Sequence, residues 1–249
     1  MNLHKGVAVR ETATCAVLVA SCPAYRPIQC IWRACQQAFW PDCPFSITMV
    51  SPERDDGWNV NLLNALETVE TPFILFLQED HFLEEVPSGQ YTNNMQAVVS
   101  LMETYEDIGL VKVQIGNAAP PEIPFAHWDR LGEYDRMPHP FKRTNLVPTM
   151  FRKTFLQRLC KAVLPYCNDS GRSGALAFEQ IGTALTMDAS QWPEKLLAID
   201  RDNGQQVLLG SMANDGVREG KLQLPPRERD ILDRIGVKFS EIPGIERFL

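Results

Sequence analysis

The hydrophobic positions in the first half of the chain follow two patterns that alternate along the sequence. Short continuous apolar runs with polar ends, such as 15–21, are typical of strands that are buried on both faces. Stripes spaced by three and four residues, such as Leu62, Leu66 and Val69, are typical of helices with one buried face. These patterns predict strands at 15–21, 45–50, 72–77 and 108–115, and helices at 28–39, 58–69 and 90–105.

The regular alternation of strands and helices predicts βαβ units. We therefore expect an α/β fold in which helices flank a mainly parallel sheet. Ligands of such sheets bind beyond the carboxyl ends of the strands. Polar loops follow the first three predicted strands, at 21–27, 51–57 and 78–85. The predicted fold places these three loops together at one rim of the sheet.

The second half of the chain has a different character. Residues 117–148 contain six prolines mixed with aromatic residues, and a loop of this length in a compact domain is usually functional or flexible. Helical patterns return at 150–164, at 175–187 after a turn-rich break, and at 226–235. We expect one domain over 1–249, with a ligand-binding half at 14–116 and a second half at 117–249 built around it.

Composition and charge narrow the classes of function. The 249 residues are 45% hydrophobic and 22% charged, which are globular values that exclude a disordered or coiled-coil chain. Acidic residues exceed basic ones, 31 to 24, for a net charge of −7. Nucleic-acid binding needs a surplus of Lys and Arg, so this balance argues against it. A small anionic ligand remains compatible, because a local basic or metal-bearing site can hold it.

Neither a targeting segment nor a cysteine framework is evident. Residues 1–14 lack the apolar stretch of a secretory signal, and no apolar run approaches the ~18 residues of a membrane span. The seven cysteines include no C-x-x-C pair, which favours buried reduced thiols over a zinc site. We therefore expect a cytoplasmic protein without a membrane span, although peripheral membrane contact stays open.

The end of the third predicted strand carries the clearest candidate chemistry. The sequence contains no phosphate-binding loop of the G-x-x-x-x-G-K-[ST] type, no G-x-G-x-x-G after a strand and no G-x-S-x-G elbow. Glu79 and Asp80, however, directly follow an apolar strand. Paired carboxylates suit Mg²⁺ or Mn²⁺, which bind through one or two such groups and substrate phosphates. Alternatively, the two residues cap the strand or pair with a nearby Arg or Lys.

Three segments in this order resemble the GT-A glycosyltransferases, near family 2. They are the turn Ser21-Cys-Pro-Ala-Tyr-Arg26-Pro27, the acidic loop after the second strand, and Phe73-Ile-Leu-Phe-Leu-Gln-Glu-Asp80. The resemblance covers 14–116 as a nucleotide-sugar-binding half and, more loosely, 146–187 within an acceptor-binding half. It implies transfer of a sugar from a nucleoside-diphosphate sugar to a hydroxyl, with inversion, in glycan or polysaccharide biosynthesis. The acceptor class (sugar, lipid-linked or other hydroxyl) stays open.

The resemblance also assigns donor and metal residues. Asp80 matches the last Asp of the family's D-x-D motif, whereas Gln78 stands in place of the first. A divalent cation, Mn²⁺ or Mg²⁺, would then rest on Asp80, with Glu79 and His81 as further candidate ligands. The implied donor-binding residues are Ser21, Arg26, Glu53, Asp55, Asp56, Glu79 and Asp80.

The implied catalytic base is Glu179, within the predicted helix at 175–187. A base that takes a proton from a hydroxyl needs hydrogen-bond reach and partial desolvation, which we expect from Leu176, Phe178 and Ile181. The alternative is a solvated surface carboxylate. Arg152 and Lys153, in a segment that resembles the family's strand-then-helix element, either meet the leaving diphosphate or lie on the surface.

Residues of the 117–148 loop are candidates for acceptor binding. Trp128 and Tyr134 would stack on an acceptor sugar, unless they serve packing alone. Two other functions compete with sugar transfer. A nucleotidyltransferase would need a Gly-rich, basic first turn, which 21–27 lacks. A non-catalytic nucleotide-sugar-binding module is the reading that Gln78 favours.

Overall fold

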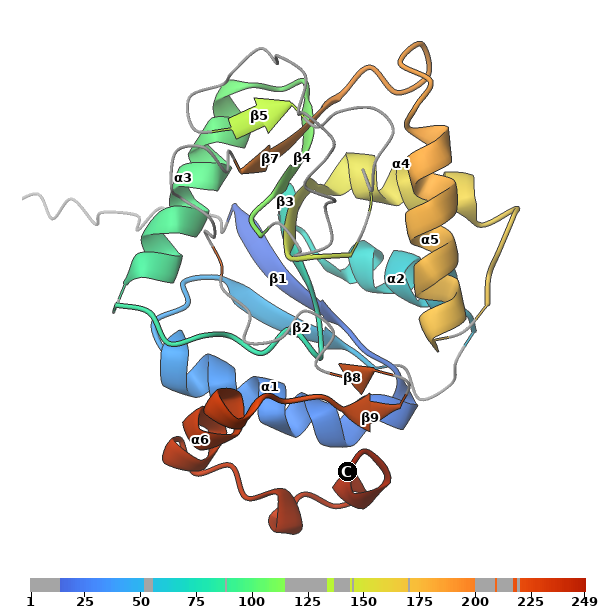
Figure 1. Ribbon diagram of the computed structural model, residues 1–249. Coiled ribbons are helices and arrows are strands. Elements are labelled where there is room, and N and C mark those ends of the chain that lie inside the picture. Colours follow the sequence, from blue (N-terminus) through green and yellow to red (C-terminus); the bar gives the residue numbers. More distant parts are fainter. Residues whose placement is uncertain are drawn as a thin grey trace, which may run out of the picture.

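The computed structural model describes residues 14–51, 56–87, 89–114, 134–136, 144, 146–169, 171–199, 209, 217–218 and 220–249. Within them, a seven-stranded sheet has the order β2-β1-β3-β6-β4-β7-β5 (Figure 1). Five strands run parallel, and β6 and β5 are antiparallel to their neighbours. The prediction of an α/β fold with a mainly parallel sheet is confirmed. The strands are β1 (Cys15–Ala20), β2 (Ser46–Val50), β3 (Phe73–Gln78), β4 (Ile108–Lys112), β5 (Tyr134–Arg136), β6 (Thr149–Arg152) and β7 (Lys195–Ile199).

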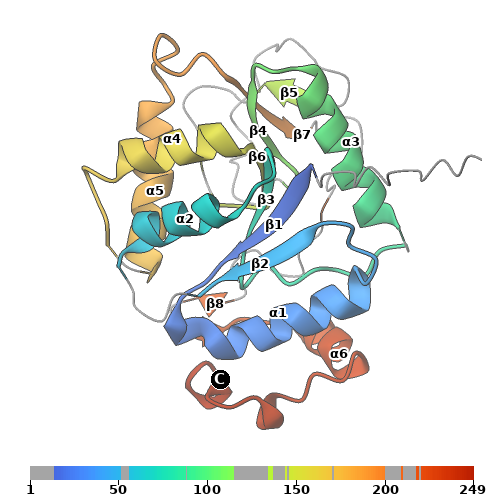
Figure 2. The same ribbon diagram turned by 180° about the vertical axis from the view of Figure 1, so that it is seen from behind.

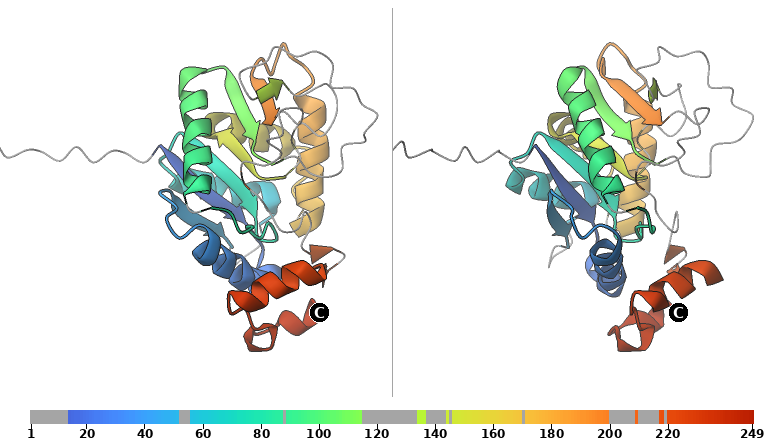
Figure 3. Two further views of the ribbon diagram at one scale, coloured as in Figure 1. Left: turned by 60° about the vertical axis from the view of Figure 1, so that its left-hand side comes forward. Right: turned by 90° about the vertical axis from the view of Figure 1, so that its left-hand side faces the viewer.

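Helices cover both faces of the sheet. One core lies between the sheet, α1 and α3, whereas α2, α4 and α5 enclose a second core on the opposite face. Figure 3 shows α3 and α5 on opposite sides of the sheet. Alternate residues of β1 enter the two cores, Val17 and Val19 the first and Ala16 and Leu18 the second, as the pleat of a fully buried strand requires. The helices are α1 (Arg26–Phe39), α2 (Trp58–Thr68), α3 (Gln90–Thr104), α4 (Lys153–Val163), α5 (Gly171–Leu185) and α6 (Pro226–Arg234).

The last part of the chain packs against α1 and the turn that precedes it. It contains the hairpin β8 (Val217–Arg218) and β9 (Lys221–Leu222), then α6 and the 3-10 turns η2 (Phe239–Glu241) and η3 (Ile245–Arg247). Figures 1 and 2 show this segment beside α1. The Phe248 ring lies 5.3 Å from that of Tyr25 in the 3-10 turn η1 (Pro23–Tyr25), which joins β1 to α1. The C-terminal segment therefore supports the first polar turn.

Several boundaries differ from those predicted. The helix α1 begins at Arg26 rather than at residue 28, because proline is tolerated in the first turn of a helix. The helix α5 begins at Gly171, within the predicted break. At Gly174 a Cβ atom would lie 2.5 Å from the Cβ of Trp58, so a glycine is what lets α5 approach α2 closely. Residues 150–152 belong to β6 and not to the predicted helix at 150–164.

The two predicted halves share one sheet, since β6, from the second half, lies between β3 and β4 of the first. The strand β7 was not predicted, because its apolar run of only four residues is short. Most of the predicted 117–148 loop lies outside the described residues. No helix among the described residues has both the length and the hydropathy needed to cross a membrane.

Candidate functional site

The carboxyl ends of the first three strands meet at one rim. Ala20 at the end of β1 is in register with Val50 of β2 and with Gln78 of β3. Two backbone hydrogen bonds continue this alignment beyond the strands. The Ser21 amide donates to the Val50 carbonyl at 2.9 Å, and the Glu79 amide donates to the Ala20 carbonyl at 3.2 Å. The predicted meeting of the first and third polar loops is therefore found in the structure.

A recess opens between the ends of β1 and β2 and the first turns of α2. Trp58, which lines it, has its ring packed against Phe178 at 4.9 Å between centroids and against Phe76 at 6.1 Å. Trp58 and Asn61 were not among the predicted site residues. The only signal for them in the sequence is their place at a helix start after the second polar loop. The recess is lined by Ala20, Ser21, Cys22, Val50, Trp58, Asn61 and Leu62.

The loop between α4 and α5 fixes the start of α2. The Asp169 carbonyl accepts from the Trp58 amide at 2.9 Å, and the Asn168 side chain donates to the Asp56 carbonyl at 2.8 Å. Gly57 between them has a φ of +99°, which favours glycine. Asp56 is exposed at this edge of the recess, whereas Glu53 and Asp55 lie outside the described residues. Arg26 is exposed at the first residue of α1.

The turn after β3 is closed by His81. The Gln78 amide donates to His81 Nδ1 at 3.1 Å, and the His81 amide donates to the Gln78 carbonyl at 3.1 Å. Burial lowers the pKa of His81 to about 3, so the ring is neutral at physiological pH. Because Nδ1 accepts a hydrogen bond, the ring proton is on Nε2. This use of the imidazole argues against its predicted role as a metal ligand.

Glu79 and Asp80 lie half-buried after β3. Burial raises the pKa of Glu79, and the charge of Asp80 raises it further. Such a carboxylate pair is stabilised by a proton or by a bound cation. The two groups fit a hard divalent ion that takes its other ligands from phosphate and water. No group of three or more His, Cys, Asp and Glu side chains converges in the described part of the chain.

Glu179 is held against the segment that leads into β6. Its Oε1 accepts from the Leu146 amide at 2.6 Å, and its carbonyl accepts from Thr144 Oγ1 at 2.9 Å. Thr149, the first residue of β6, is in register with Phe76 of β3. Because β6 is antiparallel, the segment before it lies at the carboxyl rim. Glu179 therefore lies toward the same rim of the sheet as the acidic pair.

The surroundings of Glu179 differ in part from those predicted. Phe178 is fully buried and Ile181 is half-buried, as the expected desolvation requires, but Leu176 is 47% exposed. Leu176 is three positions before Glu179 and so lies near it on the surface of α5, but its exposure keeps it from desolvating the carboxylate. The predicted desolvation is therefore wrong for Leu176, and it comes from Phe178, Thr144 and Leu146.

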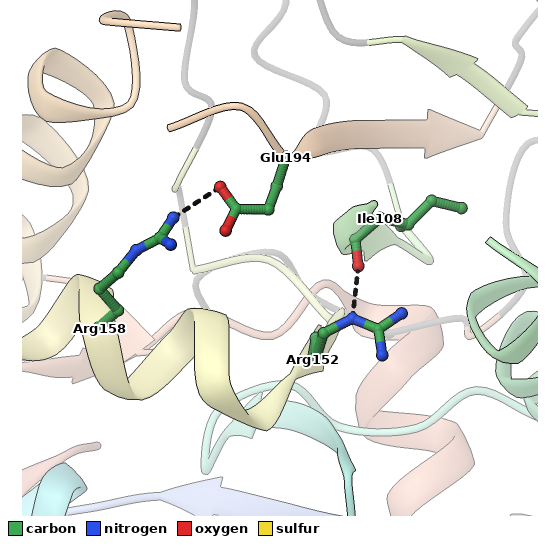
Figure 4. Close-up of polar contacts among 4 residues, drawn as sticks. All are labelled: Ile108, Arg152, Arg158 and Glu194. Carbon is green, nitrogen blue, oxygen red and sulfur yellow. Dashed lines mark hydrogen bonds and ion pairs between the residues drawn. The ribbon is translucent and has the colours of Figure 1, made fainter. Parts of the chain in front are cut away.

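Arg152 and Lys153 lie at the opposite rim. Arg152 is in register with Phe73, the first residue of β3, and its Nε donates to the Ile108 carbonyl at 3.0 Å (Figure 4). Lys153 Nζ donates to the Val69 carbonyl. Both predicted alternatives are wrong, because these side chains neither face the acidic pair nor extend into solvent. They tie β6 and α4 to the amino ends of the parallel strands.

The two predicted acceptor residues lie in or near the long loop. Tyr134 begins β5 and pairs with Ile199, the last residue of β7, so its backbone is also at the carboxyl rim. Trp128 lies outside the described residues.

Sequence comparisons find no family model and no curated protein that matches the chain. Solved structures do match at low similarity. S. aureus TarS 1–349 has a TM-score of 0.40 and 10% identity over 75% of this chain, which spans 57% of that one. The same fragment in complex with UDP-GlcNAc has a TM-score of 0.37 and 10% identity, over 67% of this chain and 52% of that one.

A third solved structure comes from a differently named protein. A CMP:2-keto-3-deoxy-manno-octonic acid synthetase complexed with CTP has a TM-score of 0.34 and 9% identity, over 75% of this chain and 88% of that one. These three likenesses are low in both identity and TM-score. With TM-scores below 0.5, they carry no argument about the reaction.

Proposed function

We propose that the chain is a glycosyltransferase that moves a sugar, with inversion, from a nucleoside-diphosphate sugar to a hydroxyl acceptor. The observation that carries this proposal is the position of Glu179. The Leu146 amide holds its carboxylate on the rim where the recess and the acidic pair also lie. A nucleotide pocket, a place for a diphosphate and a carboxylate base are the three parts that such a transfer needs.

The donor would lie across the ends of β1, β2 and β3. The nucleoside would bind over the recess that Ser21 and Trp58 line. The exposed Asp56 precedes α2 beside it, and Arg26 is exposed at the first residue of α1. Glu79 and Asp80 are the residues that would hold Mn²⁺ or Mg²⁺, and such an ion would supply positive charge to the leaving diphosphate. The raised pKa of Glu79 supports this role, because a cation beside the pair replaces the proton that burial favours.

Glu179 would act as the general base. Its carboxylate accepts the proton of the acceptor hydroxyl while the acceptor oxygen forms a bond to the anomeric carbon. The bond from that carbon to the diphosphate oxygen breaks, and the diphosphate leaves with the electron pair. The hydrogen bond from the Leu146 amide fixes one carboxylate oxygen at 2.6 Å, which orients the group before the acceptor arrives.

The test compares Glu179→Gln with a matched control, Glu67→Gln. Gln keeps an acceptor oxygen for the Leu146 amide, so the fold is expected to survive, and Glu67 is an exposed carboxylate on α2. Calorimetry with a panel that includes UDP-GlcNAc and CTP, with and without Mn²⁺, identifies the nucleotide. We expect Glu179→Gln to bind it as the wild type does and to lose transfer by at least about 100-fold. Transfer near the wild-type rate would exclude Glu179 as the base.

A non-catalytic nucleotide-sugar-binding module is the second candidate, because Gln78 stands where a metal-binding carboxylate is expected. The same calorimetry separates the two. Binding of a nucleotide sugar with slow hydrolysis supports the transferase, and binding without turnover of any kind supports the module. If no nucleotide binds, both proposals fail.

A further inference from the structure

A single side chain connects the ends of β1 and β2. Gln29 lies in the first turns of α1, and its Nε2 donates to Ser21 Oγ at 2.7 Å and to Ser51 Oγ at 3.1 Å. Ser21 lines the recess, and Ser51 directly follows Val50, which also lines it. All three side chains are half-buried, so they are neither solvated surface groups nor part of the core. One amide thus sets the orientation of two hydroxyls where the nucleotide would bind.

The hydrogens of the Gln29 amide determine how the two serine hydroxyls are oriented. An amide nitrogen carries two hydrogens, and the two serine oxygens take both of them. Each hydroxyl therefore accepts from Gln29 and directs its own hydrogen elsewhere. For Ser21 the acceptor within the protein is the Cys22 carbonyl at 3.5 Å, which is too long for a strong hydrogen bond. The Ser21 hydrogen is thus available to a ligand in the recess.

We propose that Gln29 is a positioning residue that presents the hydroxyl of Ser21 to the recess as a hydrogen-bond donor, for an acceptor oxygen of the nucleotide. This inference rests on the proposed function. The oxygen belongs either to a carbonyl of the base or to the diphosphate, and both have the same chemistry toward a hydroxyl donor. The recess is in this way biased toward groups that accept hydrogen bonds and against amino groups that donate them.

The decisive variant is Gln29→Glu, which preserves the shape of the side chain and removes its donor. Both serines would then donate to the carboxylate, and Ser21 would turn its lone pairs toward the recess. Gln29→Ala removes the orienting group but leaves the hydroxyls free to donate. If Gln29 had only a structural role, Gln29→Ala would weaken nucleotide binding at least as much as Gln29→Glu does. The matched charge control is Gln37→Glu, at an exposed position of the same helix.

Calorimetric titration with UDP, CDP and inorganic pyrophosphate, together with thermal melting, tests the inference. We expect Gln29→Glu to bind UDP about tenfold more weakly, Gln29→Ala about threefold, and Gln37→Glu as the wild type does. A loss that is larger for UDP than for CDP identifies a base carbonyl, because the two bases differ by a carbonyl and an amino group. An equal loss that extends to pyrophosphate identifies the diphosphate.

Other results overturn the inference. Wild-type affinity in Gln29→Glu would show that Ser21 does not donate to the ligand, and an equal loss in both Gln29 variants would show a structural role. If Gln29→Glu does not fold, Ser21→Ala replaces it, with a severalfold weaker affinity expected and an unchanged affinity excluding the inference. If the wild-type protein binds none of the three ligands, the proposed function itself fails.

Discussion

Replacing Arg152 by Met removes a group that the structure assigns to stability and not to catalysis. Its guanidinium donates to the backbone carbonyls of Met102 at 2.7 Å and Tyr105 at 3.2 Å. It also donates to the carbonyl of Ile108 at 3.0 Å, the contact drawn in Figure 4, so three carbonyls are bound. It also lies 5.2 Å from the centroid of the Phe73 ring. Two of the three carbonyls come from the C-terminal end of α3, where a positive charge is favourable.

The size of the effect follows from these contacts. A hydrogen bond from a charged donor contributes about 1.5–3 kcal/mol, but water replaces part of it at a half-buried site. For three such bonds that share one side chain, we expect a loss of about 2–4 kcal/mol in the free energy of unfolding. Met retains most of the aliphatic packing, so the loss reports the guanidinium.

Urea unfolding followed by circular dichroism measures this loss. The control is Arg158→Met, since Arg158 pairs with Glu194 at 2.6 Å and stacks 4.2 Å from the Trp192 ring but is 46% exposed. We expect about 1 kcal/mol there. Folded Arg152→Met should bind nucleotide with wild-type affinity. Wild-type stability in Arg152→Met would refute the stabilising role. A folded variant that loses nucleotide affinity would instead support contact between Arg152 and the diphosphate.

Three further outcomes are expected. Burial lowers the pKa of His81 from 6.5 to about 3, so the unfolded state binds this proton first, and His81 alone contributes a loss of about 2 kcal/mol in the free energy of unfolding from pH 7 to pH 5. The raised pKa of Glu79 acts in the opposite direction, so urea titrations at both pH values should compare the wild type with His81→Gln, which lacks the His81 contribution. Gly57→Ala places a Cβ atom 2.2 Å from the Asn168 carbonyl oxygen at a φ of +99°, and should lower the melting temperature with a loss of about 2–4 kcal/mol. Arg247→Ala removes the hydrogen bond to the Ala24 carbonyl, and calorimetry should show a severalfold weaker nucleotide affinity, whereas an unchanged affinity would separate the C-terminal segment from the site.

The candidate site was predictable only where it lies close to a strand end. Glu79 and Asp80 directly follow a strand whose continuous apolar run identifies it, and the carboxyl-end rule then places them at the ligand rim. Glu179 was found through a family resemblance, and its hydrogen bond to Leu146 joins residues 33 positions apart. Arg152 was a candidate for binding the diphosphate. The sequence did not show that its strand is antiparallel, which places Arg152 at the rim opposite the acidic pair.

Local hydrophobic patterns were sufficient to predict the strands β1 to β4, the helices between them and a mainly parallel sheet, apart from a few residues at the element boundaries. Hydrophobic period is a local property, and it fixes which face of a helix or strand is buried. The antiparallel position of β6 between β3 and β4 could be found only from the tertiary packing. This position places Arg152 at one rim of the sheet and the segment before Thr149, which contacts Glu179, at the other. The tertiary packing also decided that Gln29 reaches both Ser21 and Ser51. Such pairings depend on contacts between segments distant in the chain, and these contacts are set by packing the whole core and not by any local pattern.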